Sequence, residues 1–181
     1  MFILLFISCS NDPLDLSSPL NGGEALAGVI DSDSALFGGI SAEGSHGDLK
    51  IYNDRARFII QGVRDSGYYI TQGGGVIDAD IARIEGQPGR DMVDEWGGMF
   101  GLGRLMEPEV VEVIDDGSES GVAHIHTRGP EAVMTLLTGA IEADIVPDFG
   151  LYLETDYKLA ADSYFLQVTT TITATIEDVL I

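Results

Sequence analysis

The sequence predicts an all-β protein, built as a sandwich of antiparallel sheets. From residue 47 onward, short segments rich in β-branched and aromatic residues alternate with turn signals made of Gly, Asn and Asp. No stretch of a dozen residues shows the apolar period of 3.6 residues that marks an amphipathic helix. The 181 residues suit one sizeable domain, and 45% apolar residues are enough for a packed core.

The first expected strands lie in the N-terminal half. Residues 11–23 contain Pro, Asp, Asn and Ser without a periodic apolar face, which indicates a linker, and residues 26–30 are the first expected strand. Two strands are expected within GDLKIYNDRARFIIQG (47–62), joined by a turn at Asn53 and Asp54. A further strand is expected within GGGVIDADIARIEG (73–86), where apolar residues recur along an extended path.

The C-terminal half predicts a hairpin followed by three strands. In VVEVIDDGSESGVAHIHTRG (110–129) both arms alternate apolar and polar residues around a turn at residues 115–117. Further strands are expected within 133–146, 150–160 and 164–176, the last of which is nearly all β-branched.

The last strand carries two further expectations. Because residues four apart on a strand share a face, Val168 and Ile172 are expected on a buried face, with Thr169 and Thr171 opposite them. The strand reaches the end of the chain without a polar tail or a turn. We therefore expect a sandwich that is incomplete at its C-terminus.

The only cysteine, Cys9, follows an apolar run at residues 1–7 and precedes a polar, proline-bearing stretch. The run is far too short for a transmembrane helix, which needs about 20 residues. A buried terminal strand would leave the lone cysteine unexplained. The pattern resembles the lipobox of bacterial lipoprotein signals, in which the cysteine is acylated and becomes the mature N-terminus. No basic residue precedes the run, which indicates a start codon assigned too late.

The lipobox resemblance implies where the protein acts and how it is divided. Lipid attachment at Cys9 would anchor it to the bacterial cell envelope, at the outer membrane or the cell surface. The expected domains are a truncated signal at 1–9, a linker with the first strand at 10–46, and the β-sandwich at 47–181.

The charge of the chain excludes one class of partner. Thirty acidic residues face nine basic ones, for a formal net charge of −21. Such a field repels the phosphate backbones of nucleic acids, so nucleic acid is not an expected partner. A single cysteine also excludes an internal disulfide.

Two resemblances to known families extend this interpretation. Residues 47–62, 73–83 and 86–91 resemble the N-terminal part of large secreted proteins and lipoproteins of myxobacteria and their relatives. Some of those proteins end in a metal-dependent hydrolase domain of the PHP type. Residues 151–175 are similar to the paired strands of galactose-mutarotase-like supersandwiches. These resemblances imply a structural module, with any catalytic domain lying beyond Ile181.

Two sets of residues are candidate metal ligands. His124 and His126 point the same way on a strand and could bind Zn²⁺, although such a pair also occurs on a plain strand face. Asp78, Asp80 and Asp91 belong to an acidic region that could supply oxygen ligands to Ca²⁺, or could form ion pairs with nearby arginines. Neither set has a diagnostic spacing, so no cofactor is assigned.

Three aromatic residues in Gly-rich stretches are candidate ligand-binding residues: Tyr68, Tyr69 and Trp96. Aromatic rings on such loops stack against the apolar faces of sugar rings, but loop anchors use the same residues. The leading functional expectation is therefore a lipid-anchored, non-catalytic accessory or binding module, with carbohydrate as a candidate ligand. The alternative is the N-terminal part of a carbohydrate-active or metal-dependent hydrolase.

Overall fold

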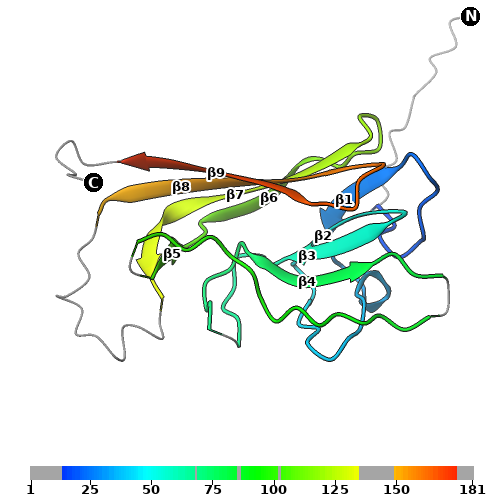
Figure 1. The fold of residues 1–181 in the computed structure, drawn as a ribbon, viewed down its shortest axis with the longest axis horizontal. Coiled ribbons are helices and arrows are strands. Elements are labelled where there is room, and N and C mark those ends of the chain that lie inside the picture. The colour runs from blue at the N-terminus through cyan, green and yellow to red at the C-terminus, as the bar shows by residue number, and fades with distance from the viewer. Residues whose placement is uncertain (1–13, 68, 85–86, 102, 135–148, 175–181) are drawn as a thin grey trace, which may run out of the picture.

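The computed structural model describes residues 14–67, 69–84, 87–101, 103–134 and 149–174. Its strands form two antiparallel sheets that pack face to face, as Figure 1 shows, which confirms the predicted all-β sandwich. The strands are β1 (Ala25–Val29), β2 (Leu49–Asn53), β3 (Ala56–Ile60), β4 (Val76–Ile81), β5 (Arg104–Met106), β6 (Val110–Asp115), β7 (Val122–Val133), β8 (Leu151–Ala160) and β9 (Gln167–Ala174).

The first sheet has the strand order β1-β2-β3-β4, and each strand pairs with the next along the chain. The predicted turn between β2 and β3 is closed by Asn53, whose side-chain oxygen accepts hydrogen bonds from the backbone N–H groups of Arg55 and Ala56. In β4 the pairing shifts, so that Val76 lies opposite Ile60 while Asp78 lies opposite Ile59. This bulge sets the face on which the later residues of β4 lie.

The second sheet has the order β5-β7-β8-β9, and β6 also pairs with β7. The strand β7 is long enough to pair with β6 near its start and with β5 near its end. The predicted hairpin at 110–129 is thus present as β6 and β7. The strand expected within 133–146 lies outside the described residues from 135 onward.

The core between the two sheets is built from the side chains at every second position of their strands. Ala27 and Ile51 from the first sheet meet Ile125, Tyr157 and Leu159 from the second, and each is almost fully buried. Alternation along each strand places these side chains inward, as period-2 patterns require. Asn53 also joins the sheets at one end, where its amide nitrogen donates to the carbonyl oxygens of Ala160, the last residue of β8, and of Ser163.

The other face of the first sheet is covered by a loop layer, which we define as residues 14–20, 30–46 and 87–93. Leu16, Ile30 and Phe37 from this layer pack on Tyr52 and Ile59 of the sheet. Figure 1 shows these segments on the side of the first sheet away from the second. The first sheet is therefore a middle layer, which explains why every residue of β2 is buried.

The loop layer corrects the expectation of a free linker at residues 11–23. Leu16 is buried, and its carbonyl oxygen accepts a hydrogen bond from the Lys50 ammonium at 2.6 Å. The part of this stretch around Leu16 therefore belongs to the fold. Among the described residues, no helix is long and apolar enough to span a membrane.

The expectation of a buried, central last strand is wrong. Among the residues that the structure describes, β9 pairs with β8 alone and so lies at the edge of the sheet, and Ile172 is 44% exposed. The alternation was predicted correctly, because Val168 packs against the core while Thr169 and Thr171 are exposed on the opposite face. Ile172 shares the face of Val168 but remains half exposed.

Candidate functional site

The three aspartates considered as calcium ligands hold different parts of the chain in place. Among the described residues, no group of three or more His, Cys, Asp or Glu side chains is arranged to hold a metal ion. Asp78, Asp80 and Asp91 each have a different set of hydrogen-bond donors. The three carboxylates therefore have separate structural roles in the described residues.

Asp80 forms the ion pairs that the alternative interpretation expected. Its carboxylate lies 2.8 Å from Arg57 Nη2 and 2.6 Å from Arg83 Nη2, and it also accepts a hydrogen bond from the backbone N–H of Arg90. Burial raises the pKa of Asp80, but the hydrogen bonds from the two arginines outweigh it and hold the pKa well below its usual range. The carboxylate thus ties β3 and β4 to the chain that follows.

Asp78 caps the loop that precedes β2. Its two oxygens accept hydrogen bonds from the backbone N–H groups of Glu43 and Gly44, at 2.8 and 2.9 Å. Burial raises the pKa of Asp78 to about 6, although these two hydrogen bonds oppose the shift. Asp78 lies under the loop layer and has no surface exposed to solvent.

Asp91 joins two parts of the loop layer. Its Oδ1 accepts hydrogen bonds from the backbone N–H groups of Ala79 and Val93, and its backbone forms a bridge with Gly39. A Cβ atom at Gly39 would lie within 2.6 Å of the Asp91 backbone, so only glycine allows the two chains to approach this closely. The role of Asp91 is therefore to pin one loop against another.

The two histidines lie together on the outer face of the second sheet. His124 Nε2 and His126 Nδ1 are 2.7 and 2.9 Å from the same oxygen of Asp156, which lies on the neighbouring strand β8. Burial raises the pKa of Asp156, but its hydrogen bonds with the two imidazoles outweigh this effect and lower the pKa. This is a strand-face arrangement with one shared carboxylate.

Asp156 was not singled out by the sequence, although a signal for it was present. Polar side chains occupy every second position of β8 and so indicate one polar face: Tyr152, Glu154, Asp156 and Lys158. The antiparallel register places Asp156 opposite His126, and the polar pattern alone does not contain this register.

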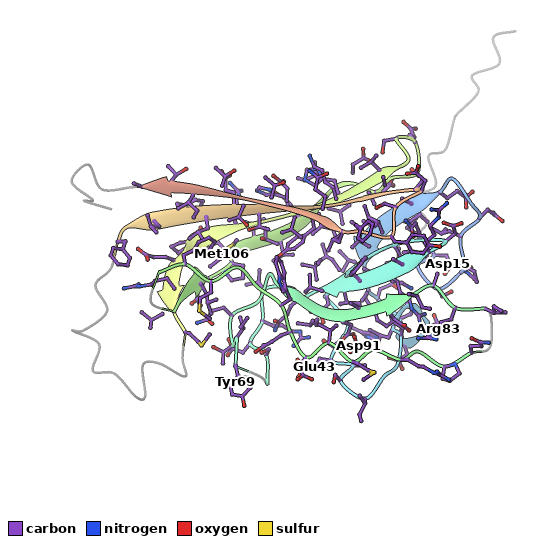
Figure 2. The ribbon with its side chains drawn as sticks, in the orientation of Figure 1. Asp15, Glu43, Tyr69, Arg83, Asp91 and Met106 are labelled. Carbon is purple, nitrogen blue, oxygen red and sulfur yellow. The ribbon has the colours of Figure 1, made fainter. Side chains whose placement is uncertain are left out.

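Tyr69 and Trp96 lie on two loops that are joined by a hydrogen bond between the residues next to them. Tyr69 is 66% exposed and Trp96 is 48% exposed. The loops are joined between these residues, because the backbone N–H of Ile70 donates to Glu95 Oε1 at 2.7 Å. Figure 2 shows Tyr69 on the side of the molecule away from the second sheet. Tyr68 lies outside the described residues.

The backbone of Trp96 is held rigidly. Its N–H donates to the carbonyl oxygen of Val76 at 2.7 Å, and its own carbonyl accepts from the N–H of Val76 at 2.9 Å. This bridge holds the Trp96 backbone beside Val76, the first residue of β4. An exposed aromatic ring on a fixed backbone loses little freedom when it binds a ligand, which favours a recognition role.

A small cavity lies near this aromatic pair and limits how a ligand could bind. It has a volume of about 30 Å³ and is lined by Ile70, Phe100 and Tyr157 together with glycines 73–75, 97 and 98. That volume holds one or two water molecules, but no sugar ring. A ligand larger than water must therefore lie on the surface, across the exposed rings.

No family model, curated protein or solved structure matches the chain. Of the sites predicted from sequence, the pair of Tyr69 and Trp96 is the one whose described members are both exposed and held on adjoining loops.

Proposed function

We propose that this chain is a non-catalytic β-sandwich binding module, held at the bacterial cell envelope by a lipid on Cys9, and that it binds carbohydrate through Tyr69 and Trp96. The supporting observation is the exposure of both rings on loops joined by the hydrogen bond from Ile70 to Glu95. The apolar faces of sugar rings stack on such aromatics.

The two-sheet fold supports a binding role in a second way. The loops that carry the aromatic pair extend from a sheet buried on both faces, so the scaffold beneath them is rigid. Binding residues on loops held by a rigid scaffold are a common arrangement in proteins. Accordingly, the loops contact the ligand, and the sheets only hold the loops in position.

Trp96 provides a direct measurement, because it is the only tryptophan in the chain. Titration with β-1,4-linked hexasaccharides of glucose and of N-acetylglucosamine is expected to change its fluorescence in a saturable way. Tyr69→Ala is expected to weaken this binding about tenfold, which corresponds to ~1.4 kcal/mol. Trp96→Ala should abolish binding measured by calorimetry.

The matched control is Phe165→Ala, which removes an aromatic ring that is 81% exposed on the connection between β8 and β9. This variant should bind like the unchanged protein. An absence of saturable binding to either sugar series, or equal losses in Phe165→Ala and Tyr69→Ala, would contradict the carbohydrate assignment.

Anchoring through Cys9 is tested separately. With an upstream start restored, the protein expressed in a bacterial host is expected in the membrane fraction, because an acylated cysteine inserts its acyl chains into the bilayer. Cys9→Ser should release it to the soluble fraction, whereas Ser10→Ala, the neighbouring control, should stay with the membrane. An unchanged protein that is soluble and retains residues 1–8 would show that the lipobox interpretation is wrong.

A further inference from the structure

A second cavity lies on the outer face of the first sheet. It has a volume of about 280 Å³ and is bounded by residues 17–20 of the loop layer, by β2 and β3, and by residues 82–84. This volume is close to the lower end of the range of small-molecule sites. The cavity is separate from the loops that carry Tyr69 and Trp96.

The lining of this cavity concentrates positive charge in an acidic protein. Lys50, Arg57 and Arg83 all line it, which is three of the nine basic residues of the chain. Asp54 lines it too, and lies 3.6 Å from Arg55 Nε. A local excess of cations attracts anions to a site even where the net charge of the protein is negative.

Lys50 is a buried cation without a carboxylate partner among the described residues. Its exposed fraction is 4%, and its ammonium donates a hydrogen bond to the carbonyl oxygen of Leu16 and lies 4.4 Å from the centre of the Tyr52 ring. Neither of these neighbours carries a negative charge. A lysine ammonium has three donors, so this geometry leaves donors for a further acceptor.

Arg57 adds a second donor. Its Nη2 pairs with Asp80 and its guanidinium lies over the Phe37 ring at 4.5 Å, but its Nε is buried and has no hydrogen-bond partner among the described residues. Asp80 is shared with Arg83, so one carboxylate faces two guanidinium groups. Together with Lys50, these groups carry more positive charge than Asp80 offsets.

We propose that this cavity binds a small oxyanion, a phosphate or carboxylate group, through the Lys50 ammonium and the Arg57 guanidinium. Charge-assisted hydrogen bonds from ammonium and guanidinium groups to such oxygens are stronger than hydrogen bonds between neutral groups. Phosphate and carboxylate share this chemistry, and the experiment below separates them.

The protonation of Lys50 supports the assignment. Burial, together with the nearby positive charge of Arg57, lowers the pKa of Lys50 to about 8, while Asp15 acts in the opposite direction. A bound anion favours the charged ammonium, so binding is linked to proton uptake and should weaken as the pH rises above 8.

The chain contains only two lysines, Lys50 and Lys158, which gives an internal control without any substitution. The full chain is treated with formaldehyde and cyanoborohydride at pH 8, with increasing inorganic phosphate or acetate, and methylation of each lysine is measured by mass spectrometry. The occupying anion is expected to slow methylation of Lys50 at least fivefold, while Lys158 is unchanged. Protection by phosphate alone or by acetate alone identifies the preferred anion.

Calorimetry provides the second test. Lys50→Met, which keeps the apolar stem, is expected to weaken anion binding at least tenfold, whereas Lys158→Met, the same charge change on the outer face of the second sheet, should leave it unchanged. If Lys50→Met fails to fold, the lysine-protection experiment on the unchanged chain decides alone. Equal effects on both lysines, or no saturable protection by either anion up to 50 mM (roughly the weak limit of a specific site), would overturn the proposal.

Discussion

Replacing Asp48 with alanine is expected to lower the free energy of unfolding by about 3–5 kcal/mol. Asp48 is fully buried, and its carboxylate accepts hydrogen bonds from Arg64 Nε at 2.8 Å and Nη2 at 2.6 Å. It also accepts hydrogen bonds from the backbone N–H groups of Gly62 and Ser45. The substitution therefore removes an acceptor from the Arg64 guanidinium, from two backbone N–H groups and from the Ser45 hydroxyl.

Urea unfolding measures this effect, with Asp65→Ala as the control, since Asp65 is one residue from Arg64 but exposed. The control should change stability by no more than about 0.5 kcal/mol. Adding Arg64→Met to Asp48→Ala should recover part of the loss, because the charge left without a partner is removed. A cost below 1 kcal/mol for Asp48→Ala would show that the pair is not a structural tie.

Leu153→Ala is expected to cost about 2–5 kcal/mol, whereas Ile172→Ala, one strand away, should cost less than about 1 kcal/mol. The two residues lie directly opposite each other on β8 and β9. Leu153 has no exposed surface, because β8 has strands on both sides and its inner face is covered, while Ile172 is on the edge strand and 44% exposed.

The paired comparison isolates strand position, since both residues share one face of the same sheet. Thermal unfolding of the two variants in the same buffer provides the measurement. Similar losses for the two variants would mean that β9 belongs to the core more than its exposure indicates. A small loss for Leu153→Ala would mean that the cavity it leaves is filled by relaxation of its neighbours.

The strands could be predicted from the sequence because their signals are local. A turn residue such as Asn53, and the alternation along 110–129, both act within a few residues of where they stand. The position of a strand within a sheet is not local. The same alternation that placed Val168 and Ile172 on one face gave no information on β9 being at an edge, because that depends on which strands pair.

The loop layer could not be predicted, because its residues follow no period. Leu16 is a single apolar residue between Asp15 and Ser17, and Phe37 ends a run of only three apolar residues; only the folded chain shows that they pack on the first sheet. The same limit applies to Lys50. On the sequence it alternates with apolar neighbours, as a solvent-facing strand residue does, yet the loop layer covers it.

The candidate sites were predicted in part. Tyr69 and Trp96 were singled out as aromatic residues in Gly-rich stretches, but neither their exposure nor the hydrogen bond to Glu95 that joins their loops was predicted. For Asp78 and Asp91, residue type alone does not distinguish a carboxylate that would bind a cation from one that accepts backbone N–H groups. Only the fold decides between these partners.

The cover on both faces of the first sheet sets the order in which the protein opens. Strands that lie under two layers exchange their amide protons only after both layers have separated, so β2 belongs to the most protected cooperative unit. The exposed residues of β9 are at the opposite end of this scale, since they can fray without disturbing either core cluster. Between these extremes, release of the loop layer alone would uncover Lys50 while the sandwich itself stayed folded.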